Sequence, residues 1–418
     1  MKKNILIIGA GAVGSVVAHK CAQSSQYFSS VYMGSRSIDK CEKIITSIEN
    51  KNYQHTDSFN IQAVSIDAYN TAAIIENIRN NNINIVINVC TAFVNKSILN
   101  ACIETGAAYI DTAVHEDYDV MNAPFPWYEN HEWKKREICE DRGITAILGC
   151  GFDPGVVNAY CAYAQEFEFD DITSIDIMDV NDGDHGRFFS TNFDPEINLR
   201  EIIEDAGCLE DGEWKDYPHH SRSMAYDFPV VGEKQIYLMG HDEVHSLAVN
   251  IKGVKNVRFW MGFDDHYLNC LNVFKNVGLL NIEKVTTADG TEVVPLHVLK
   301  ACLPDPASLA ATYTGKTCIA TLINGTKDNK PKEVIIYNIC DHEETYSDVD
   351  SQAIAFTAGV PPVAAAILIA KGDWDVKKMK NVEELKSKPF LTELEKLGIS
   401  TEITTLSVKE KEDELISA

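Results

Sequence analysis

The first 150 residues alternate short apolar runs with amphipathic stretches. Apolar runs that predict strands cover residues 4–9, 29–33, 61–66, 83–90, 107–112 and 144–148. Stretches with helical spacing lie between them and include residues 13–23, 39–50, 71–80, 96–105 and 129–141. Uniformly apolar strands separated by helices are typical of a parallel sheet covered on both faces. We therefore predict a doubly wound α/β domain over residues 1–155.

The pattern changes after residue 155. Residues 174–180, 235–239, 257–262 and 333–340 have the pattern of longer strands with mixed faces, separated by acidic loops. This indicates an antiparallel sheet in an inserted α+β domain over residues 156–350. A small-residue helix over 351–370 and a charged helical tail follow, and we expect residues 351–418 to pack back on the first domain. The apolar run 361–370 is shorter than the roughly 18 residues of a membrane span.

A glycine motif marks the start of the first helix. Gly9, Gly11 and Gly14 form G-x-G-x-x-G around Ala12 and Val13, directly after the first strand. In that position the glycines allow a tight turn, close approach of backbone N–H groups to a pyrophosphate, and close helix–strand contact. The first domain is therefore predicted to be a Rossmann-type dinucleotide-binding domain.

The end of the second strand indicates which dinucleotide binds. An NAD enzyme usually carries Asp or Glu there, but this chain has Gly34-Ser35-Arg36-Ser37. Arg36 can pair with a 2′-phosphate and stack on adenine, and Ser35 can donate to the same phosphate, which favours NADPH. The alternative is that Arg36 is only a solvated surface residue. Asp67, after the third strand, could reach the adenine edge.

Two further strand ends face the same crevice. Cys90, Thr91 and Ala92 follow the fourth strand, and Asp111 and Thr112 follow the fifth. Cys90 could be a nucleophile or a small buried thiol that lines the pocket. Asp111 is a candidate for proton transfer.

Composition limits the partners. The chain has 37 Lys and Arg against 62 Asp and Glu, a formal net charge of −25. Such a chain repels nucleic acids and anionic membranes and attracts cationic substrates. Twelve scattered cysteines without a C-x-x-C pair, and a start without a signal-like segment, predict reduced thiols in the cytoplasm. Acidic loops could hold an ammonium group or be simply solvated: Asp179, Asp182 and Asp184 in one, Asp264 and Asp265 in another.

Two other motifs only partly match known binding sites, one for zinc and one for ATP. His241 and His245 are spaced i, i+4, which could hold zinc, but the order is not H-E-x-x-H and a third ligand is not evident. We expect no metal; His245 remains a candidate proton donor. Residues 312–317 end in Gly-Lys-Thr but lack the first glycine of a P-loop, so we expect no ATP site.

Gly151-Phe152-Asp153-Pro154-Gly155, a G-x-D-P-G turn after the sixth strand, resembles the saccharopine dehydrogenase-like reductases. Residues 188–202, 237–247, 258–262 and 352–361 narrow the resemblance to the carboxynorspermidine and carboxyspermidine dehydrogenase branch. The resemblance spans nearly the whole chain. It implies NADPH-dependent condensation of L-aspartate β-semialdehyde with putrescine or 1,3-diaminopropane, through an imine that hydride reduces. The implied cofactor contacts are Gly11, Ala12, Val13, Ser35, Arg36, Asp67, Thr91 and Asp153.

The resemblance leaves the substrate side open. Phe193 stands where fungal saccharopine reductases carry a substrate-binding arginine, so Arg187 and Arg200 are nearby candidates for the carboxylate. The family also points to a homodimer, for which Phe259, Trp260 and Met261 could supply apolar contact area. Two other functions remain: a saccharopine reductase that uses glutamate, and a non-catalytic NADP sensor on the same fold. A glutamate site needs basic residues near the crevice, whereas a diamine site needs acids.

Overall fold

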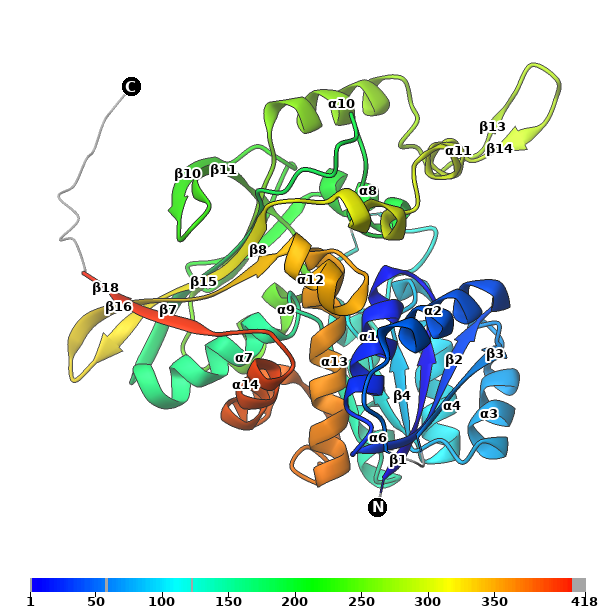
Figure 1. Ribbon diagram of the computed structural model, residues 1–418. Coiled ribbons are helices and arrows are strands. Elements are labelled where there is room, and N and C mark those ends of the chain that lie inside the picture. Colours follow the sequence, from blue (N-terminus) through cyan, green and yellow to red (C-terminus); the bar gives the residue numbers. More distant parts are fainter. Residues whose placement is uncertain (1, 57–58, 122, 408–418) are drawn as a thin grey trace.

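The computed structural model describes residues 2–56, 59–121 and 123–407. A parallel sheet forms the first half of the molecule, in the strand order β17–β6–β5–β4–β1–β2–β3 (Figure 1). Its strands are β1 (Lys3–Ile8), β2 (Phe28–Ser35), β3 (Asn60–Ser65), β4 (Ile85–Asn88), β5 (Ala108–Ile110), β6 (Ala146–Leu148) and β17 (Met379–Asn381). The predicted doubly wound sheet is confirmed, and the order reverses between β1 and β4. That reversal places a crevice at the carboxyl ends of the strands.

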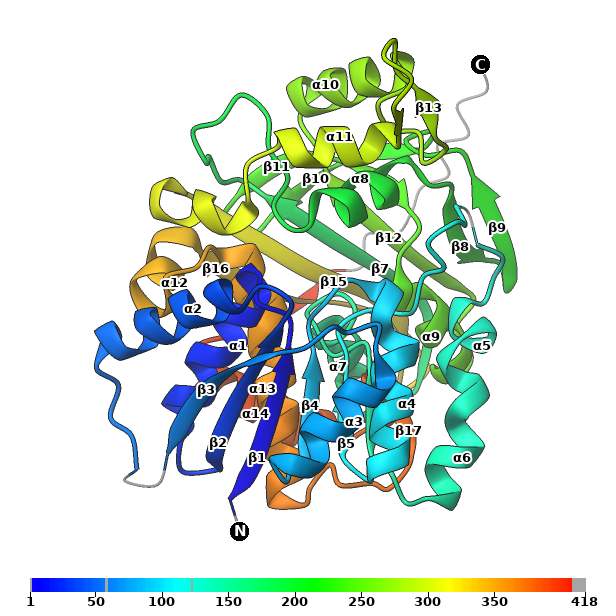
Figure 2. The same cartoon turned by 90° about the vertical axis from the view of Figure 1, so that its right-hand side faces the viewer.

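Helices cover both faces of this sheet because β1 is apolar on both sides. Ile5 and Ile7 pack into one core with α1 and α2, while Leu6 and Ile8 pack into another with α3 and α4. Figure 2 shows the two helical layers on either side of the strands. These helices are α1 (Ala12–Gln23), α2 (Ile38–Lys51), α3 (Thr71–Asn80) and α4 (Asn95–Thr105), and a 3₁₀ turn η1 (Ala92–Val94) precedes α4.

The helix predicted over residues 129–141 is broken into three pieces: α5 (Trp127–Asn130), the 3₁₀ turn η2 (Glu132–Lys135) and α6 (Arg136–Asp141). The backbone leaves helical geometry at His131, with φ −125° and ψ −99°. The next residue, Glu132, is buried and accepts a hydrogen bond of 2.8 Å from the His115 N–H. This inward-turned carboxylate interrupts the amphipathic pattern.

The second sheet is mixed rather than antiparallel. Its main path is β10–β11–β12–β7–β15–β16–β18, with β8 and β9 attached at β12, and β7 runs parallel to β12. The chain crosses over between these two strands, so both point the same way. The strands are β7 (Asp171–Asn181), β8 (Ala206–Glu210), β9 (Glu213–Tyr217), β10 (Ser223–Phe228), β11 (Gly232–Met239), β12 (Asn256–Gly262), β15 (Lys316–Lys327), β16 (Lys330–Asp341) and β18 (Glu402–Leu406).

Helices and a projecting hairpin surround this sheet (Figure 1). The hairpin is β13 (Val285–Thr286) and β14 (Glu292–Val293). The helices are α7 (Val156–Tyr163), a π-helical turn η3 (Ala164–Glu168), α8 (Pro195–Ile203), α9 (Asp242–Asn250), α10 (Asp265–Asn276), α11 (Pro295–Cys302), the 3₁₀ turn η4 (Pro306–Thr312) and α12 (His342–Val349).

The C-terminal segment, predicted to pack on the first domain over residues 351–418, returns to both sheets over the described residues 351–407, and residues 408–418 lie outside the described part. Helix α13 (Ala353–Lys371) lies along α1, where a Cβ at Gly359 would come within 2.7 Å of the Val16 Cβ. After it, β17 joins the first sheet, a 3₁₀ turn η5 (Val382–Glu384) and α14 (Ser387–Lys396) follow, and β18 joins the second sheet instead of continuing as helix. Within the described residues, α13 is the one helix long and apolar enough to cross a membrane, longer than the apolar run suggested, but most of it is buried.

Two of the apolar side chains expected to supply a dimer contact lie inside the protein. Phe259 is fully buried and stacks on His241, with ring centroids 3.9 Å apart. Trp260 is buried and donates its indole N–H to Asp176 at 2.9 Å. Strand β12 is central in its sheet, so these side chains pack within the chain and are unavailable to a partner.

Candidate active site

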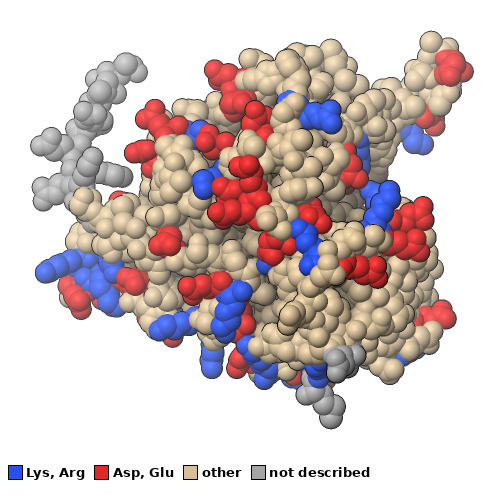
Figure 3. Space-filling model, in the orientation of Figure 1, with Lys and Arg blue, Asp and Glu red and all other residues tan. Residues whose placement is uncertain are grey.

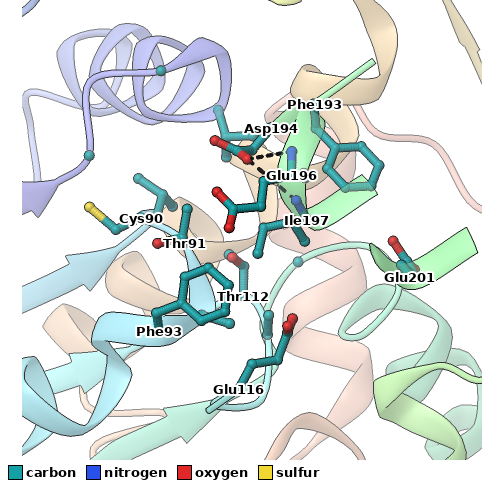
Figure 4. A pocket seen from close by; sticks show the side chains of 18 of the residues that line it. Cys90, Thr91, Phe93, Thr112, Glu116, Phe193, Asp194, Glu196, Ile197 and Glu201 are labelled. Carbon is teal, nitrogen blue, oxygen red and sulfur yellow. Dashed lines mark hydrogen bonds between the residues drawn. The ribbon is translucent and has the colours of Figure 1, made fainter. Parts of the chain in front are cut away.

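A cavity of about 830 Å³ lies at the carboxyl edge of the first sheet, and elements of the second half close it. The strand ends of the first half contribute one wall. Helix α8, the turn after β11 and the adjoining faces of β7, β12 and β15 contribute the other. Figure 4 shows Asp194, Glu196 and Glu201 on one side, with Thr91 and Glu116 among the side chains facing them.

The glycine turn has the shape that a pyrophosphate requires. Gly9 has a φ of +126°, and a Cβ on it would lie 2.6 Å from the Val89 carbonyl oxygen. A Cβ on Gly14 would lie 2.0 Å from the Gly9 carbonyl oxygen, so both glycines permit close backbone packing. Gly11 has open space there instead, at an α1 N-terminus that has no side-chain cap. Free backbone N–H groups beside open space fit a bound dinucleotide, and Ala12 and Val13 also line this part of the cavity.

The adenine end of the cavity is basic. Ser35, Arg36 and Lys40 line it, and Arg36 is exposed at the tip of β2. Lys40 pairs with Asp305 of the second half at 3.0 Å, across the cavity mouth. Asp67 also lines this end and accepts a hydrogen bond from the Tyr69 N–H. Because Lys40 is already paired with Asp305, the exposed Arg36 is the group at this end that fits a phosphorylated ribose.

The three predicted proton-transfer residues have different positions. Cys90 lines the cavity beside Thr91, Ala92 and Thr112, but burial raises the pKa of its thiol to about 12. Asp111 lies beneath the surface, outside the lining, and accepts a hydrogen bond of 2.7 Å from the Gly149 N–H. Burial and the Glu132 carboxylate raise the pKa of Asp111 well above its usual range. A neutral thiol and an enclosed acid are poorly placed for proton transfer in the cavity.

His245 is enclosed by aromatic rings rather than facing substrate. It is fully buried and stacks on Trp127, with ring centroids 4.2 Å apart. Burial lowers its pKa to about 3, so it is neutral near pH 7. It lies outside the cavity lining, whereas His241 at the start of α9 faces the cavity.

Of the predicted substrate residues, Asp179 lines the cavity, whereas Arg187, Arg200, Asp182 and Asp184 lie outside the lining. Arg187 is exposed, Asp182 pairs with Lys234, and Asp184 accepts from the Gly186 N–H at 2.7 Å. These three residues belong to a loop exposed to solvent, which was the alternative to ammonium binding for this acidic segment.

Arg200 is the exception in burial, because its side chain points inward. It donates to the carbonyl oxygens of Tyr118 at 3.1 Å and Val120 at 2.7 Å, and lies 3.5 Å from Glu116. Arg200 therefore does not line the cavity itself. It holds the loop of residues 116–120, which does.

The cavity wall is strongly acidic. Eleven carboxyl side chains line it against three Lys or Arg. Lys300 is held by Asp194, at 2.9 Å, and Glu196, at 3.2 Å. The other two bases are at the adenine end, so the substrate end has an excess of acid. The eleven are Asp67, Glu116, Asp117, Asp153, Asp179, Asp194, Glu196, Glu201, Glu204, Asp242 and Asp305.

Sequence reasoning missed most of these acids. Ile197, Glu201 and Glu204 are spaced i, i+4 and i+7, which places them on one side of α8 and the residue after it, and all three line the cavity. This helical spacing is the sequence feature that could have placed Glu201 and Glu204 on one face. Glu116, in the loop that Arg200 holds, has no local pattern that marks it. Burial raises its pKa to about 7, although Arg200 opposes the shift.

The deepest part of the acidic wall contains a pair of carboxyls and a histidine. Asp153, after β6, hydrogen-bonds to Asp179 on β7, and both line the cavity. His241 is next to them, with its Nε2 2.8 Å from Glu201 and its Nδ1 hydrogen-bonded to Glu243. Burial opposes a charge on His241, but the Glu243 and Glu201 carboxylates raise its pKa well above the usual value. The histidine is therefore an imidazolium held between two carboxylates.

A second group of side chains resembles a metal site in composition. His115, Asp117 and His131 bring their ligand atoms within 4.8 Å of one another at the cavity edge. Asp117 is already paired with the Lys96 ammonium at 2.9 Å, and the same oxygen lies 3.1 Å from the His115 Nε2. Since Lys96 supplies the positive charge beside this carboxylate, we assign no metal to the group.

Comparison with known proteins identifies the family. Residues 5–147 match the saccharopine dehydrogenase NADP binding domain, and residues 151–399 match the saccharopine dehydrogenase C-terminal domain. The chain belongs to the saccharopine dehydrogenase family. It is therefore an NADP-dependent oxidoreductase, as the glycine turn and the absence of an acid after β2 predicted.

Within this family, the chain is 46% identical to the carboxynorspermidine synthase of Vibrio alginolyticus, over 96% of this chain and 97% of that protein. It is 39% identical to the carboxyaminopropylagmatine dehydrogenase of Synechocystis, over 94% and 96%. The structure is similar to saccharopine dehydrogenase (L-Glu forming) from Saccharomyces cerevisiae, with a TM-score of 0.67 and 12% identity over 97% of this chain and all of that one. The predicted resemblance is confirmed.

Proposed function

We propose that this enzyme uses NADPH to join L-aspartate β-semialdehyde to a diamine by reductive condensation. The acidic substrate wall carries the proposal, because a diamine brings a second ammonium that carboxylates must hold. On the face shown in Figure 3, acidic side chains also gather near the centre. The names of the Vibrio alginolyticus relative and of the Synechocystis relative support a polyamine product.

The glutamate-dependent alternative fits this cavity poorly. A glutamate co-substrate carries two carboxylates, and a lining with eleven carboxyl groups against three bases offers little positive charge to bind them. Lys300 is the one Lys or Arg lining the substrate end within the described residues, and two carboxylates already match its charge, so it adds no net positive charge for a dicarboxylate. Asp194 and Glu196 hold its ammonium in place.

The cofactor and the substrates would meet between the two walls. The backbone around Gly11 would hold the pyrophosphate and Arg36 the 2′-phosphate, and bound NADPH supplies a hydride to the imine carbon. Helix α8 and Glu116 would hold the distal ammonium, which leaves the other amine near the strand ends.

The decisive assay is turnover with pure substrates. The enzyme, NADPH and L-aspartate β-semialdehyde are mixed with putrescine, 1,3-diaminopropane or agmatine, and the carboxylated product is identified by mass spectrometry. Glutamate with α-aminoadipate semialdehyde is the comparison pair. We expect product with at least one of the three amines and none with glutamate. Turnover of the glutamate pair would establish the saccharopine reductase reading. NADPH binding without turnover of either set would establish the sensor reading.

We also propose that the enzyme acts as a homodimer in the cytoplasm. All twelve cysteines are free thiols, which suits a reducing compartment. Val273, Val277, Val285 and Val298 are exposed on the segment from α10 to α11 and could supply a dimer contact. Light scattering at micromolar concentration should return twice the chain mass, and a monomer would refute the assembly.

A further inference from the structure

The junction of the two halves places two carboxyl groups against each other at the reacting end of the cavity. Asp153 follows β6 in the first half, and Asp179 belongs to β7 in the second. In the mixed sheet Asp179 pairs with Met261 on β12 and with Ile319 on β15, and all three line the cavity. Asp179 is thus the acid on a largely apolar floor that faces the strand ends.

Asp153 lies close to the position expected for the nicotinamide ring of the cofactor. Its loop packs on the end of β5, since a Cβ on Gly151 would be 3.5 Å from the Thr112 Cβ. In doubly wound folds the dinucleotide crosses the carboxyl edge from the first strand towards these later strands. The Asp153–Asp179 pair therefore faces the place where the nicotinamide and the imine carbon would meet.

We propose that Asp153 and Asp179 share one proton and transfer protons during imine formation, with His241 as the positioning residue. The proposal rests on the proposed condensation. Two carboxyls in hydrogen-bond contact cannot both be charged at low cost, so one holds a proton. Burial raises the pKa of both carboxyls, and the Asp153 carboxyl donates to the Asp179 carboxylate.

The pair balances every proton of the condensation. The Asp179 carboxylate takes a proton from the substrate ammonium, and the freed amine attacks the aldehyde carbon. The C–N bond forms, the carbonyl electron pair moves to oxygen, and Asp153 gives oxygen its proton and regains one from nitrogen. Asp179 then protonates the hydroxyl, the C–O bond breaks, and water leaves with that electron pair. The nitrogen lone pair forms the iminium, and the pair returns to one shared proton.

The groups around the pair set its proton affinity. The imidazolium of His241 lowers the pKa of both carboxyls, whereas Glu201 on α8 and Glu243 on α9 raise it. Glu201 and Glu243 also fix the His241 ring, which stacks on Phe259. His241 therefore acts through the carboxyl pair.

The test compares isosteric variants in the full-length enzyme. Asp179→Asn and Asp153→Asn should each lower kcat by about 100-fold or more, the usual range for general acid–base catalysis. The double variant should be no slower than the worse single one, because the pair acts as a unit. NADPH binding, measured by fluorescence, should change by less than twofold in Asp179→Asn, because Asp179 belongs to the second sheet and is not among the implied cofactor contacts. Asp171→Asn, an exposed position on the same strand β7, is the matched control and should keep full activity.

The pH profile tests the positioning role. His241→Gln removes the imidazolium that lowers the pKa of both carboxyls, so the rising limb of kcat/KM should shift to higher pH. His241→Lys keeps a positive charge, so the limb should stay near its wild-type position. A structural role alone would lower activity without moving the limb. If Asp153→Asn fails to fold, Asp179→Asn alone tests the pair. Its pH profile of kcat/KM should lack the rising limb of the wild type.

Deuterated NADPH separates the two proposals. The isotope effect of the wild type should fall towards one in Asp179→Asn, because proton transfer becomes rate-limiting. A variant with wild-type kcat, isotope effect and pH limb would overturn the pair while leaving the condensation intact. A wild type that turns over no amine with the semialdehyde would overturn the condensation, and the role of the pair with it.

Discussion

The two ends of the cavity are built in different ways. The cofactor end consists of consecutive residues at strand ends, and its binding groups are mostly backbone and a few bases. The substrate end is assembled from α8, the turn after β11, β7 and the loop at Glu116, which are far apart in sequence. The first end depends on backbone shape and the second on charge. Substitutions should therefore act through sterics at one end and through electrostatics at the other.

The largest effect is expected from the glycine turn. In Gly14→Ala the new Cβ would lie 2.0 Å from the Gly9 carbonyl oxygen, and backbone cannot move aside easily. Overpacking of this kind costs about 1–3 kcal/mol of stability, and the distorted turn should lose NADPH binding altogether. Gly11→Ala meets no atom within 4 Å, so it should melt like wild type yet bind NADPH at least about tenfold more weakly. Calorimetry and cofactor titration check both. Equal stability of the two variants would contradict the steric account.

Next in size is cofactor choice. Arg36→Asp should reverse the preference for NADPH over NADH, because the carboxylate repels a 2′-phosphate and accepts from a 2′-OH. A charge-assisted hydrogen bond contributes about 1.5–3 kcal/mol, so the ratio of the two kcat/KM values should move by at least about tenfold. Retention of the original ratio would show that Arg36 does not discriminate. Arg79→Asp, exposed on α3, is the matched control.

A smaller effect is expected at Glu116. Burial raises the pKa of its carboxyl to about 7, so the carboxylate is lost as pH falls through that value. The diamine KM of the wild type should therefore rise between pH 8 and pH 6. Glu116→Gln should have a KM roughly tenfold higher at pH 8 and a flat profile, with the semialdehyde KM unchanged. Asp182→Asn and Asp184→Asn, whose side chains lie outside the cavity, should match wild type. A wild-type KM that is independent of pH would exclude Glu116.

The smallest effect is expected from salt. A chain of net charge −25 attracts a dication over a screening length of about 8–10 Å. Raising ionic strength should increase the diamine KM a few-fold, while the semialdehyde KM stays level or falls. Steady-state kinetics in increasing concentrations of NaCl measure this. An unchanged diamine KM would mean that short-range contacts alone hold the amine.

The same contrast explains what the sequence could predict. The strands β1 to β6 and the turn around Gly9 follow local rules of periodicity and glycine placement, so pattern alone places them. The acids of the substrate end obey no local rule. Asp182 and Asp184 form the more obvious acidic pattern, but they follow the strand and are exposed to solvent. Asp179 lies within strand β7, on the face of the sheet that lines the cavity.

Side chains that serve the fold were also hard to separate from functional ones. Arg200 has the chemistry of a carboxylate receptor, yet the nearby backbone carbonyls of Tyr118 and Val120 take its donors. His245 has the chemistry of a proton donor, yet aromatic burial lowers its pKa to about 3. Only the tertiary surroundings decide these cases, because residue type is the same in both roles.

The path of residues 353–406 links the two halves. Helix α13 lies against α1, then β17 completes the edge of one sheet and β18 the edge of the other. A cut after residue 155 would separate β17 from the sheet that it completes, and removal of residues 353–407 would take one strand from each sheet, so we expect both truncations to destabilise the protein. We therefore expect the stabilities of the two halves to be coupled through this segment. The C-terminal segment therefore ties the wall that carries the glycine turn to the wall that carries the acidic side chains.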